Sequence, residues 1–555
     1  MGMAMPSKLL KTSCITFLLI LFSTPASPAT SPDSICSLTS YPSFCKTNLP
    51  PNGTGNIYDF GLSFINKSLS SSMEVHSLIL GYHQSQSSLS ESTILALEDC
   101  QLLCELSEDF LFKTLQTINS TNSLNSSQVD DLQTLLSAAL TNQQTCLDGL
   151  QEVQSNSNTT IKDDLLPLLS NGSMFYSISL ALFKKSWGMK TKKDRKLTVN
   201  IGGRNEHLPL RFPSWEQKLR EFITGRKLLQ SVPNNVFVSQ MVVVNPDGGG
   251  NFTTINDAVA ATPNNTSGSN GYFVIYVVAG VYQEYVSIPK NKQYLMMIGD
   301  GINQTVITGN RSVGDGWTTF NSATFAVVAQ GFVAVNITFQ NTAGAIKHQA
   351  VALRSGADFS SFYSCSFEGY QDTLYPHSLR QFYKNCDIYG TVDFIFGNAA
   401  VVFQDCNIYP RLPLQGQFNA ITAQGKTDIN QNTGTSIQNC SIMAASDLAN
   451  SNGTTKTYLG RPWKEYSRTV YLQTFMDSLI DSTGWREWSS SFALSTLYYA
   501  EYANWGPGSD TSNRVTWTGY HVINATDAVI FTVSNFITGD AWLPATGVPY
   551  FGGLL

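Results

Sequence analysis

The chain has 555 residues, of which 42% are hydrophobic and 13% charged, and its formal net charge is −6. This length exceeds one ordinary domain and the apolar content is too high for a disordered chain, so we expect at least two globular domains. The same composition excludes collagen, coiled-coil and low-complexity architectures. The small negative charge argues against nucleic-acid binding, which needs a concentrated basic surface.

Charge divides the chain into segments of different character. Residues 30–183 contain 4 Lys/Arg and 15 Asp/Glu, residues 184–227 contain 13 and 4, and residues 228–555 contain 15 and 21. This distribution predicts an acidic domain, a basic connector and a larger, mildly acidic domain. Together with the N-terminal pattern, it places the expected boundaries at 1–29, 30–185, 186–229 and 230–555.

The N-terminus has the pattern of a secretory signal. Lys8 and Lys11 precede an apolar run from Cys14 to Phe22, and small residues follow up to Ala29. The run is about ten residues long, shorter than the ~20 needed to span a bilayer, so it predicts a cleaved signal peptide rather than an anchor. We expect no later stretch to be long and apolar enough to span. About 15 Asn-x-Ser/Thr sequons follow, which is typical of a secreted glycoprotein.

The acidic segment is predicted to be helical. Between Ser88 and Leu150 the apolar residues recur at helical spacing, interrupted by a polar stretch at 119–127. Two amphipathic helices in an antiparallel pair follow from this pattern. The region is therefore expected to form an all-α up-and-down helical bundle.

Nine cysteines lie beyond the signal, and an oxidising compartment makes disulfides the expectation, with one thiol left over. Cys36 and Cys45 are close enough in sequence to close a hairpin, and Cys100 and Cys146 would lie on facing helices. Cys104, one turn after Cys100, is the candidate free thiol. The sequence has no Cys-x-x-Cys pair and no Cys/His cluster, so no metal site is expected.

Residues 186–229 are basic and end in the dibasic pair Arg226 and Lys227. A basic connector with Gly and Pro that ends in a dibasic pair before a strand-rich region indicates a processing site between domains. An uncleaved linker is the alternative, because exposed connectors permit cleavage without requiring it.

After Met241 the chain consists of short runs rich in Val, Ile, Phe and Tyr, separated by Gly and Asn. Residues 362–375 are echoed by residues 383–396, with Cys, Gly, Asp and an apolar residue recurring at an offset of 21, and a third copy starts at Phe403. Such a period with short strands is typical of a parallel β-helix, in which equivalent residues stack about 4.8 Å apart. We expect an all-β right-handed parallel β-helix, with a β-sandwich as the second possibility.

The repeat brings two carboxylates together. If Asp372 and Asp393 occupy equivalent positions on adjacent coils, they cannot both ionise easily, and the group with the raised pKa can donate a proton near neutral pH. Two Asp residues that merely terminate strands and bind turn amides are the alternative.

The residues around the pair favour chemistry. Gln349 and Gln371 supply neutral amide donors, and Arg461 could hold one carboxylate ionised. Aromatic faces suited to sugar rings come from a further set: Tyr370, Tyr375, Phe394, Phe396, Trp463 and Tyr466. The sequence has no Gly-x-Ser-x-Gly motif and no cluster of histidines, so it lacks the residues of other hydrolase mechanisms, such as a serine nucleophile with a histidine base.

These motifs resemble a known family, the plant pectin methylesterases that carry an N-terminal domain similar to the pectin methylesterase inhibitors. The matching segments are Asp247–Ile255, Gly299–Gly301, Ile307–Arg311, Asn341–Gly344, Lys347–Arg354, Gly369–Tyr375, Gly390–Ala399 and Leu459–Lys464. The N-terminal domain is similar through its cysteine spacing and helical pattern, and Arg226–Leu229 looks like the family's processing motif.

The resemblance implies a mechanism without cofactor or metal. Asp393 would be the nucleophile, Asp372 the general acid and then base, and Gln349 and Gln371 the donors to the oxyanion. The substrate would be the methyl ester of galacturonate units in cell-wall pectin. A secreted enzyme would hydrolyse this ester to a free carboxylate and methanol.

The resemblance also assigns the groove and the partners. Arg461 would position Asp393, and Trp463, Tyr375 and Phe396 would line the sugar groove. The expected partners are pectin, the chain's own N-terminal domain as an autoinhibitor or separate inhibitor proteins, and a subtilisin-like processing protease. The enzyme is expected to be a monomer that binds no nucleic acid.

Two rivals and one further expectation stay open at this point. A glycosidase also uses two nearby carboxylates, and a wall-binding β-helix could grip pectin without turnover. In the larger domain we expect disulfides between Cys365 and Cys386 and between Cys406 and Cys440, provided that stacked cysteines do not point in parallel.

Overall fold

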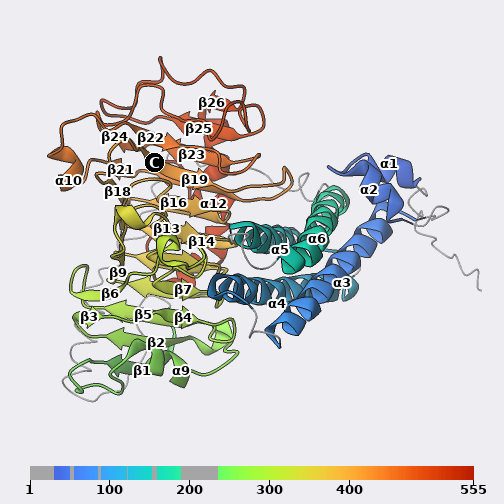
Figure 1. Ribbon diagram of the computed structural model, residues 1–555, viewed down its shortest axis with the longest axis horizontal. Helices are drawn as coiled ribbons and strands as arrows, with labels where there is room; N and C mark the ends of the chain where they lie inside the picture. The colour runs from blue at the N-terminus through green and yellow to red at the C-terminus, as the bar shows by residue number, and fades with distance from the viewer. Residues whose placement is uncertain (1–30, 50–54, 85–88, 122, 153–158, 189–235) are drawn as a thin grey trace, which may run out of the picture.

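The computed structural model describes residues 31–49, 55–84, 89–121, 123–152, 159–188 and 236–555. A bundle of long helices is followed by a tall coil of short strands, and the bundle lies against one side of the coil at mid-height (Figure 1). The predicted signal peptide and the dibasic pair Arg226–Lys227 fall outside the described residues.

Four long helices form the bundle: α3 (Ile57–His83), α4 (Glu91–Asn119), α5 (Ser126–Glu152) and α6 (Thr159–Ser186). A capping box starts α3, because the Asn56 side chain accepts hydrogen bonds from the backbone of Tyr58 and Asp59 while Asp59 binds back to Asn56. In the bundle, α4 packs on α3 and α5, and α6 packs on α3 and α5. The predicted antiparallel pair is confirmed as α4 and α5.

The helix over Ile161–Ser186 corrects one expectation. It is long and apolar enough to cross a membrane by length and composition, although 56% of its most apolar window is buried inside the protein. Its apolar content is that of a core helix, with Tyr176, Leu180 and Phe183 fully buried against neighbouring helices.

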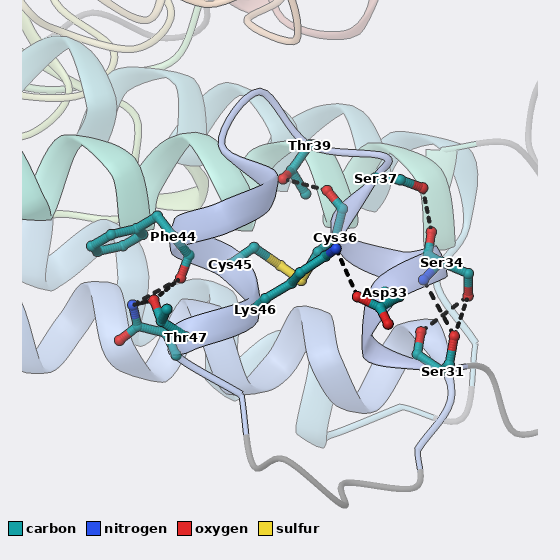
Figure 2. Close-up of a disulfide and its surroundings, with 11 residues drawn as sticks. Ser31, Asp33, Ser34, Cys36, Ser37, Thr39, Phe44, Cys45, Lys46 and Thr47 are labelled. Carbon is teal, nitrogen blue, oxygen red and sulfur yellow. Dashed lines mark hydrogen bonds and ion pairs between the residues drawn. A yellow bond between two sulfur atoms is a disulfide. The ribbon is translucent and has the colours of Figure 1, made fainter.

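Two disulfides tie the helical domain. Cys36 and Cys45 join α1 (Pro32–Cys36) to α2 (Pro42–Thr47) across a Cα–Cα distance of 5.5 Å (Figure 2). Cys100 and Cys146 join α4 to α5 across 4.7 Å. Cys104 is a buried free thiol. All three predictions for these cysteines are confirmed.

The described part of the larger domain contains three parallel sheets of 11, 7 and 8 strands. The first sheet consists of β1 (Val238–Val244), β2 (Tyr272–Val277), β5 (Leu295–Gly299), β8 (Val333–Val335), β11 (Ser360–Tyr363), β14 (Arg380–Lys384), β17 (Ala400–Gln404), β20 (Gly434–Gln438), β23 (Arg468–Leu472), β25 (Tyr498–Tyr502) and β26 (Tyr520–Val522). The second sheet consists of β4 (Val286–Ile288), β7 (Phe325–Val327), β10 (Leu353–Ser355), β13 (Leu374–Pro376), β16 (Ile395–Gly397), β19 (Asn419–Gln424) and β22 (Thr457–Gly460).

The third sheet consists of β3 (Gly280–Tyr282), β6 (Thr305–Gly309), β9 (Thr338–Asn341), β12 (Ser366–Glu368), β15 (Asp387–Gly390), β18 (Asn407–Pro410), β21 (Ser441–Ile442) and β24 (Phe475–Met476). Short helices flank the coil at α9 (Ile255–Ala261), α10 (Ser446–Ala449), α11 (Ala525–Ala528), α12 (Val533–Phe536) and α13 (Leu543–Thr546). Because successive strands of each sheet come from successive coils, the domain is a parallel β-helix, as predicted.

The sequence repeat appears directly in the strand register. Phe362 pairs with Tyr383, Ser366 with Asp387 and Leu374 with Ile395, each pair separated by 21 residues. The aromatic pair continues the stack inside the coil, with the Phe362 and Tyr383 rings 4.7 Å apart. One repeat is therefore one coil, and equivalent residues lie side by side.

A single residue with positive φ turns the chain from the first sheet to the third on successive coils. It is Ser364 at 51°, Asn385 at 52°, Asp405 at 55° and Asn439 at 52°. The residue after each turn points into the core, and on these coils it is a cysteine: Cys365, Cys386, Cys406 and Cys440.

The expected disulfides between Cys365 and Cys386 and between Cys406 and Cys440 are wrong, since all four are buried free thiols. Side chains of in-register residues on adjacent coils run parallel into the core, whereas a disulfide needs the two Cβ–Sγ bonds to approach each other. The thiols instead bind backbone oxygens of the coil, as in the 3.4 Å contact from Cys386 Sγ to the Phe362 carbonyl.

Candidate active site

Two carboxylates lie next to each other on the second sheet's edge. Asp372 and Asp393 each precede a strand of that sheet by two residues, and the pairing of Leu374 with Ile395 puts them in register on adjacent coils. Both have positive φ, 62° and 54°, and both are buried, at 7% and 4% exposure. The same left-handed conformation turns the chain elsewhere in the coil, as at Asn385, so here it directs the two carboxylates without by itself marking a functional site.

Arg461, which directly follows β22, holds one member of the pair. Its Nε donates to Asp393 Oδ1 at 2.8 Å and its Nη2 to Asp393 Oδ2 at 2.6 Å. This bidentate fork fixes the carboxylate and favours its ionised form. The guanidinium itself is supported by the ring of Trp488, whose centroid is 4.1 Å from Cζ.

The electrostatics separate the two groups. Burial and the neighbouring charges of Asp393 and Glu152 raise the pKa of Asp372 well above its usual range. Burial also raises the pKa of Asp393, but the hydrogen bonds and charge of Arg461 oppose that rise. The pair therefore suits one protonated carboxyl at Asp372 and one carboxylate at Asp393.

The two predicted amide donors lie beside the pair. Gln371 directly precedes Asp372, and Gln349 lies on the preceding coil, where the Ala350 N–H donates to the Gln371 carbonyl at 3.2 Å. Among the described residues, no hydrogen bond engages either side-chain amide, and both side chains are half-buried. Their N–H groups are available to a ligand.

The surface that was predicted to be the sugar groove is a row of aromatic rings on the outer face of the second sheet. The Tyr375 and Phe396 rings stack with centroids 4.1 Å apart, and Trp463 meets Phe396 edge-on at 6.0 Å. Gly425 lets Trp463 lie flat, because a Cβ there would come within 2.7 Å of the indole. Tyr375, Phe396 and Trp463 thus share one buried cluster.

Two rings that were predicted to face the sugar lie elsewhere. Phe394 is fully buried in the core of the coil, because its side chain points inward from the turn before β16. The Tyr370 ring packs on Arg411, whose Cζ is 4.0 Å from the ring centroid.

Helix α5 lies across this groove. One stripe of the helix, at spacings of three, four and six residues, contacts the β-helix. Its contacts are Asp131 with Arg380, Ser137 with Gln431, Thr141 with Asn398, Thr145 with His377, and Asp148 with Lys464. The helix ends at Glu152, which binds Thr319 and raises the pKa of Asp372.

Helix α4 covers the neighbouring part of the groove. Its Asp99 carboxylate accepts a hydrogen bond from the Thr318 hydroxyl at 2.5 Å, and Asp109 pairs with Lys290 at 2.7 Å. Apolar residues of the bundle share one buried cluster with Phe320, Tyr375, Phe396 and Trp463. The helical domain therefore covers the surface around the carboxylate pair.

Several residues of this site were not predicted. Phe320 meets Tyr375 edge-on at 6.5 Å and lies 5.3 Å from the His377 ring, and Trp488 supports Arg461. Arg354 packs its guanidinium against Phe320. Two signals could have found Arg354: it ends the family-matching segment Lys347–Arg354, and it pairs in register with Tyr375.

A buried carboxylate pair with amide donors, beside a row of aromatic rings on a parallel β-helix, is typical of a carbohydrate-active hydrolase. Comparison with known proteins gives the particular family. The pectinesterase family matches residues 241–540, and the plant invertase/pectin methylesterase inhibitor family matches residues 30–182. The chain belongs to the pectinesterase family and carries an N-terminal inhibitor-like domain.

Individual relatives agree with this assignment. The chain is 57% identical to a probable pectinesterase/pectinesterase inhibitor 20 of Arabidopsis thaliana, over 95% of this chain and 94% of that protein. It is 51% identical to pectinesterase 2 of Citrus sinensis, over 83% of this chain and 82% of that protein. The solved pectin methylesterase from carrot is 54% identical, with a TM-score of 0.56. The match covers 59% of this chain and 100% of the carrot protein.

Proposed function

We propose that the chain hydrolyses methyl esters of galacturonate units in pectin by covalent catalysis at Asp393. The observation that carries this proposal is the asymmetry of the carboxylate pair, in which Arg461 forks onto Asp393 while Asp372 lies buried beside it. One carboxylate is thus prepared to attack and the other to give up a proton.

The proposed reaction has two halves. The Asp393 carboxylate attacks the C6 carbonyl carbon, and the carbonyl electron pair moves onto oxygen, where the Gln349 and Gln371 amides donate hydrogen bonds. When the tetrahedral species collapses, the bond from C6 to the methoxy oxygen breaks. Asp372 protonates that oxygen, and methanol leaves. Asp372, now ionised, takes a proton from water, and the resulting hydroxide attacks the acyl-enzyme. This step releases the Asp393 carboxylate and a galacturonic acid unit, whose proton passes to solvent.

The two rivals predict different products. A glycosidase would create new reducing ends, and a wall-binding protein would release nothing. We therefore propose to measure methanol and reducing ends together on highly methylated pectin. Methanol without reducing ends supports the esterase; reducing ends, or no product from the processed domain, would contradict it.

We propose further that the helical domain inhibits the enzyme until it is removed. The contacts of α5 and α4 with the groove support this role, because pectin cannot reach Asp393 where those helices lie. The uncleaved chain should release methanol far more slowly than the processed larger domain. Equal rates would leave the helical domain a role only in folding or sorting. Separate inhibitor proteins of the same kind could occupy the same face.

Maturation is proposed to follow cleavage after Arg226–Lys227 by a subtilisin-like protease, in a secreted, monomeric protein of the cell wall. The position between an acidic domain and the strand-rich domain supports this cleavage site. N-terminal sequencing of wall-extracted protein should find a start between residues 228 and 231. A start only at residues 26–31 would contradict processing.

A further inference from the structure

A pocket of about 1040 Å³ lies between the start of α5 and the outer face of the first sheet. Its wall comes from both domains: residues 126–131 of α5, residues of the first sheet and its turns, and the C-terminal segment 530–546. Neither Asp372 nor Asp393 lines it, so it is separate from the candidate active site. The volume is at the upper end of the range for small-molecule sites, about 300 to 1,000 Å³, which favours a longer occupant such as a peptide segment.

Part of this wall is apolar and is not covered by the described residues. The Phe359 and Trp542 rings pack 5.4 Å apart in the wall. Phe237 and Ile530 also line the pocket, and they are 62% and 48% exposed. An apolar patch that stays open beside packed aromatic rings is typical of an interaction site. The occupant therefore needs apolar side chains.

The charged residues of the wall leave an excess of negative charge. Arg380 donates to both oxygens of Asp358, at 3.0 Å from Nε and 2.7 Å from Nη2, which neutralises its positive charge. Its Nη1 donates to Asp131 of α5 at 2.7 Å, and Asp130 lines the pocket as a further acidic residue. Because like charges repel, the pocket disfavours a polyanion such as pectin and favours a cationic occupant.

The basic connector is a segment of this chain that meets both requirements. Residues 218–229 contain 4 Lys/Arg and 1 Asp/Glu, together with 5 Leu, Ile or Phe residues. They lie outside the described residues, which resume at Val236, and Phe237 is part of the pocket wall. The 8 residues from Leu229 to Phe237 reach at most about 29 Å when extended. Such a short tether gives an effective concentration in the millimolar range, so weak contacts suffice for binding.

We propose that connector residues 218–229 bind in this pocket in the uncleaved chain. Their Lys and Arg side chains pair with Asp130 and Asp131, and their apolar side chains cover Phe237 and the rings of the wall. The bound segment holds the dibasic pair Arg226–Lys227 at the domain boundary, where a protease cannot take it up as extended chain. Cleavage therefore requires the segment to leave the pocket first. The inference concerns how the connector is held, and it does not depend on the proposed reaction.

The test is limited trypsin digestion of the full uncleaved chain, followed by mass spectrometry of the cut sites. The connector supplies an internal reference, because basic residues also occur at 190–196, outside the proposed segment. In the unmodified chain, cuts within 218–227 should form about tenfold more slowly than cuts within 190–196. Ala545→Arg puts a cation into the pocket and should abolish this difference. Ala261→Arg, at an exposed position on α9, is the matched control and should keep it.

Three results would overturn the proposal. They are equal cutting rates at the two places in the unmodified chain, a difference that survives in Ala545→Arg, and a difference that disappears when the unmodified chain is diluted. The last result would assign the pocket to the connector of a second copy. If thermal unfolding shows that Ala545→Arg does not fold, Ala541→Arg, at a second alanine of the wall, decides. Methanol release plays no part in this measurement, so a failure of the proposed function would leave its outcome intact.

Discussion

At the scale of single residues, Arg461 sets the pH range in which Asp393 can attack. The two hydrogen bonds from its guanidinium stabilise the carboxylate, so Arg461→Gln should raise the pKa of Asp393. Because the attacking form is the ionised one, the acidic limb of the pH profile of kcat/KM should move to higher pH, and activity should fall more at pH 5 than at pH 8. Arg486→Gln, whose guanidinium packs on Phe418, is the control. A uniform loss at all pH values would contradict this assignment.

Replacing each carboxylate by an amide should reduce the rate of methanol release to a different extent. Asp393→Asn keeps the shape but removes the nucleophile, so methanol release should fall by several orders of magnitude. Asp372→Asn removes a proton donor, a role that contributes about 10² to 10⁴-fold. Single-turnover measurement of methanol in both variants tests this, with circular dichroism as the check on folding. Near-normal methanol release in a folded Asp393→Asn protein would show that the repeat is only structural.

The repeat placed two site residues side by side from the sequence, whereas Arg461 and Trp463, outside the repeat, were identified by residue type and by the family resemblance without a position in space. The offset of 21 places Asp372 beside Asp393 because in-register stacking converts a sequence period into a distance. Thr318 and Phe320 lie in a loop outside the 21-residue repeat, so the repeat does not predict their positions. Asp99 belongs to another domain, and nothing in its local sequence says which surface it meets.

At the scale of elements, the turns between the first and third sheets depend on one left-handed residue per coil. Asn385 has φ of 52°, is exposed and follows β14. Asn385→Val puts a β-branched side chain into this conformation and should destabilise the fold by about 1 to 2 kcal/mol. Asn385→Gly, which accepts positive φ freely, should change stability by less than about 1 kcal/mol. Thermal unfolding of the processed domain compares the two; equal loss in both would contradict a backbone origin.

The same stacking explains both a success and a failure at this scale. It predicted the strands and their order, since a β-helix repeats one coil. It also placed Cys365 next to Cys386, from which a disulfide was expected. Register fixes which residues are neighbours, but parallel side chains in a stack do not provide the crossing geometry of a disulfide. In the bundle, where Cys100 and Cys146 face each other from two helices, proximity and orientation agree.

At the scale of the whole molecule, the sequence predicted two domains but not how they meet. From the sequence, the face of α5 that contacts the β-helix resembles an ordinary solvent-exposed helix face, because Ser137, Thr141 and Thr145 are small and polar. Only the assembled structure shows that these residues bind Gln431, Asn398 and His377 across the domain boundary. Domain docking depends on complementary surfaces far apart in sequence, for which no local pattern exists.

The docked arrangement should respond to pH through Asp99. Burial in the interface raises the pKa of Asp99 to about 7, with the charges of Glu98 and Glu152 adding to the rise and Arg354 opposing it. An exposed Asp has a pKa of about 3.9. Between about pH 4 and pH 7, Asp99 therefore carries a proton in the docked state but not in the undocked state. Docking is therefore stabilised fully below the lower pKa, and that stabilisation is lost as pH rises through the higher one. Glu152, whose pKa is raised to about 7 but whose side chain is solvent-exposed, should contribute less.

The expected result is a pH-dependent release of inhibition in the uncleaved chain. The ratio of its methanol release to that of the processed domain, measured at each pH so that the catalytic groups cancel, should rise several-fold from pH 5 to pH 8. Asp99→Asn cannot ionise and should flatten this ratio, whereas Asp163→Asn, at an exposed position on α6, should leave it rising. A ratio that stays constant in the unmodified chain, or rises equally in Asp99→Asn, would show that another group controls docking.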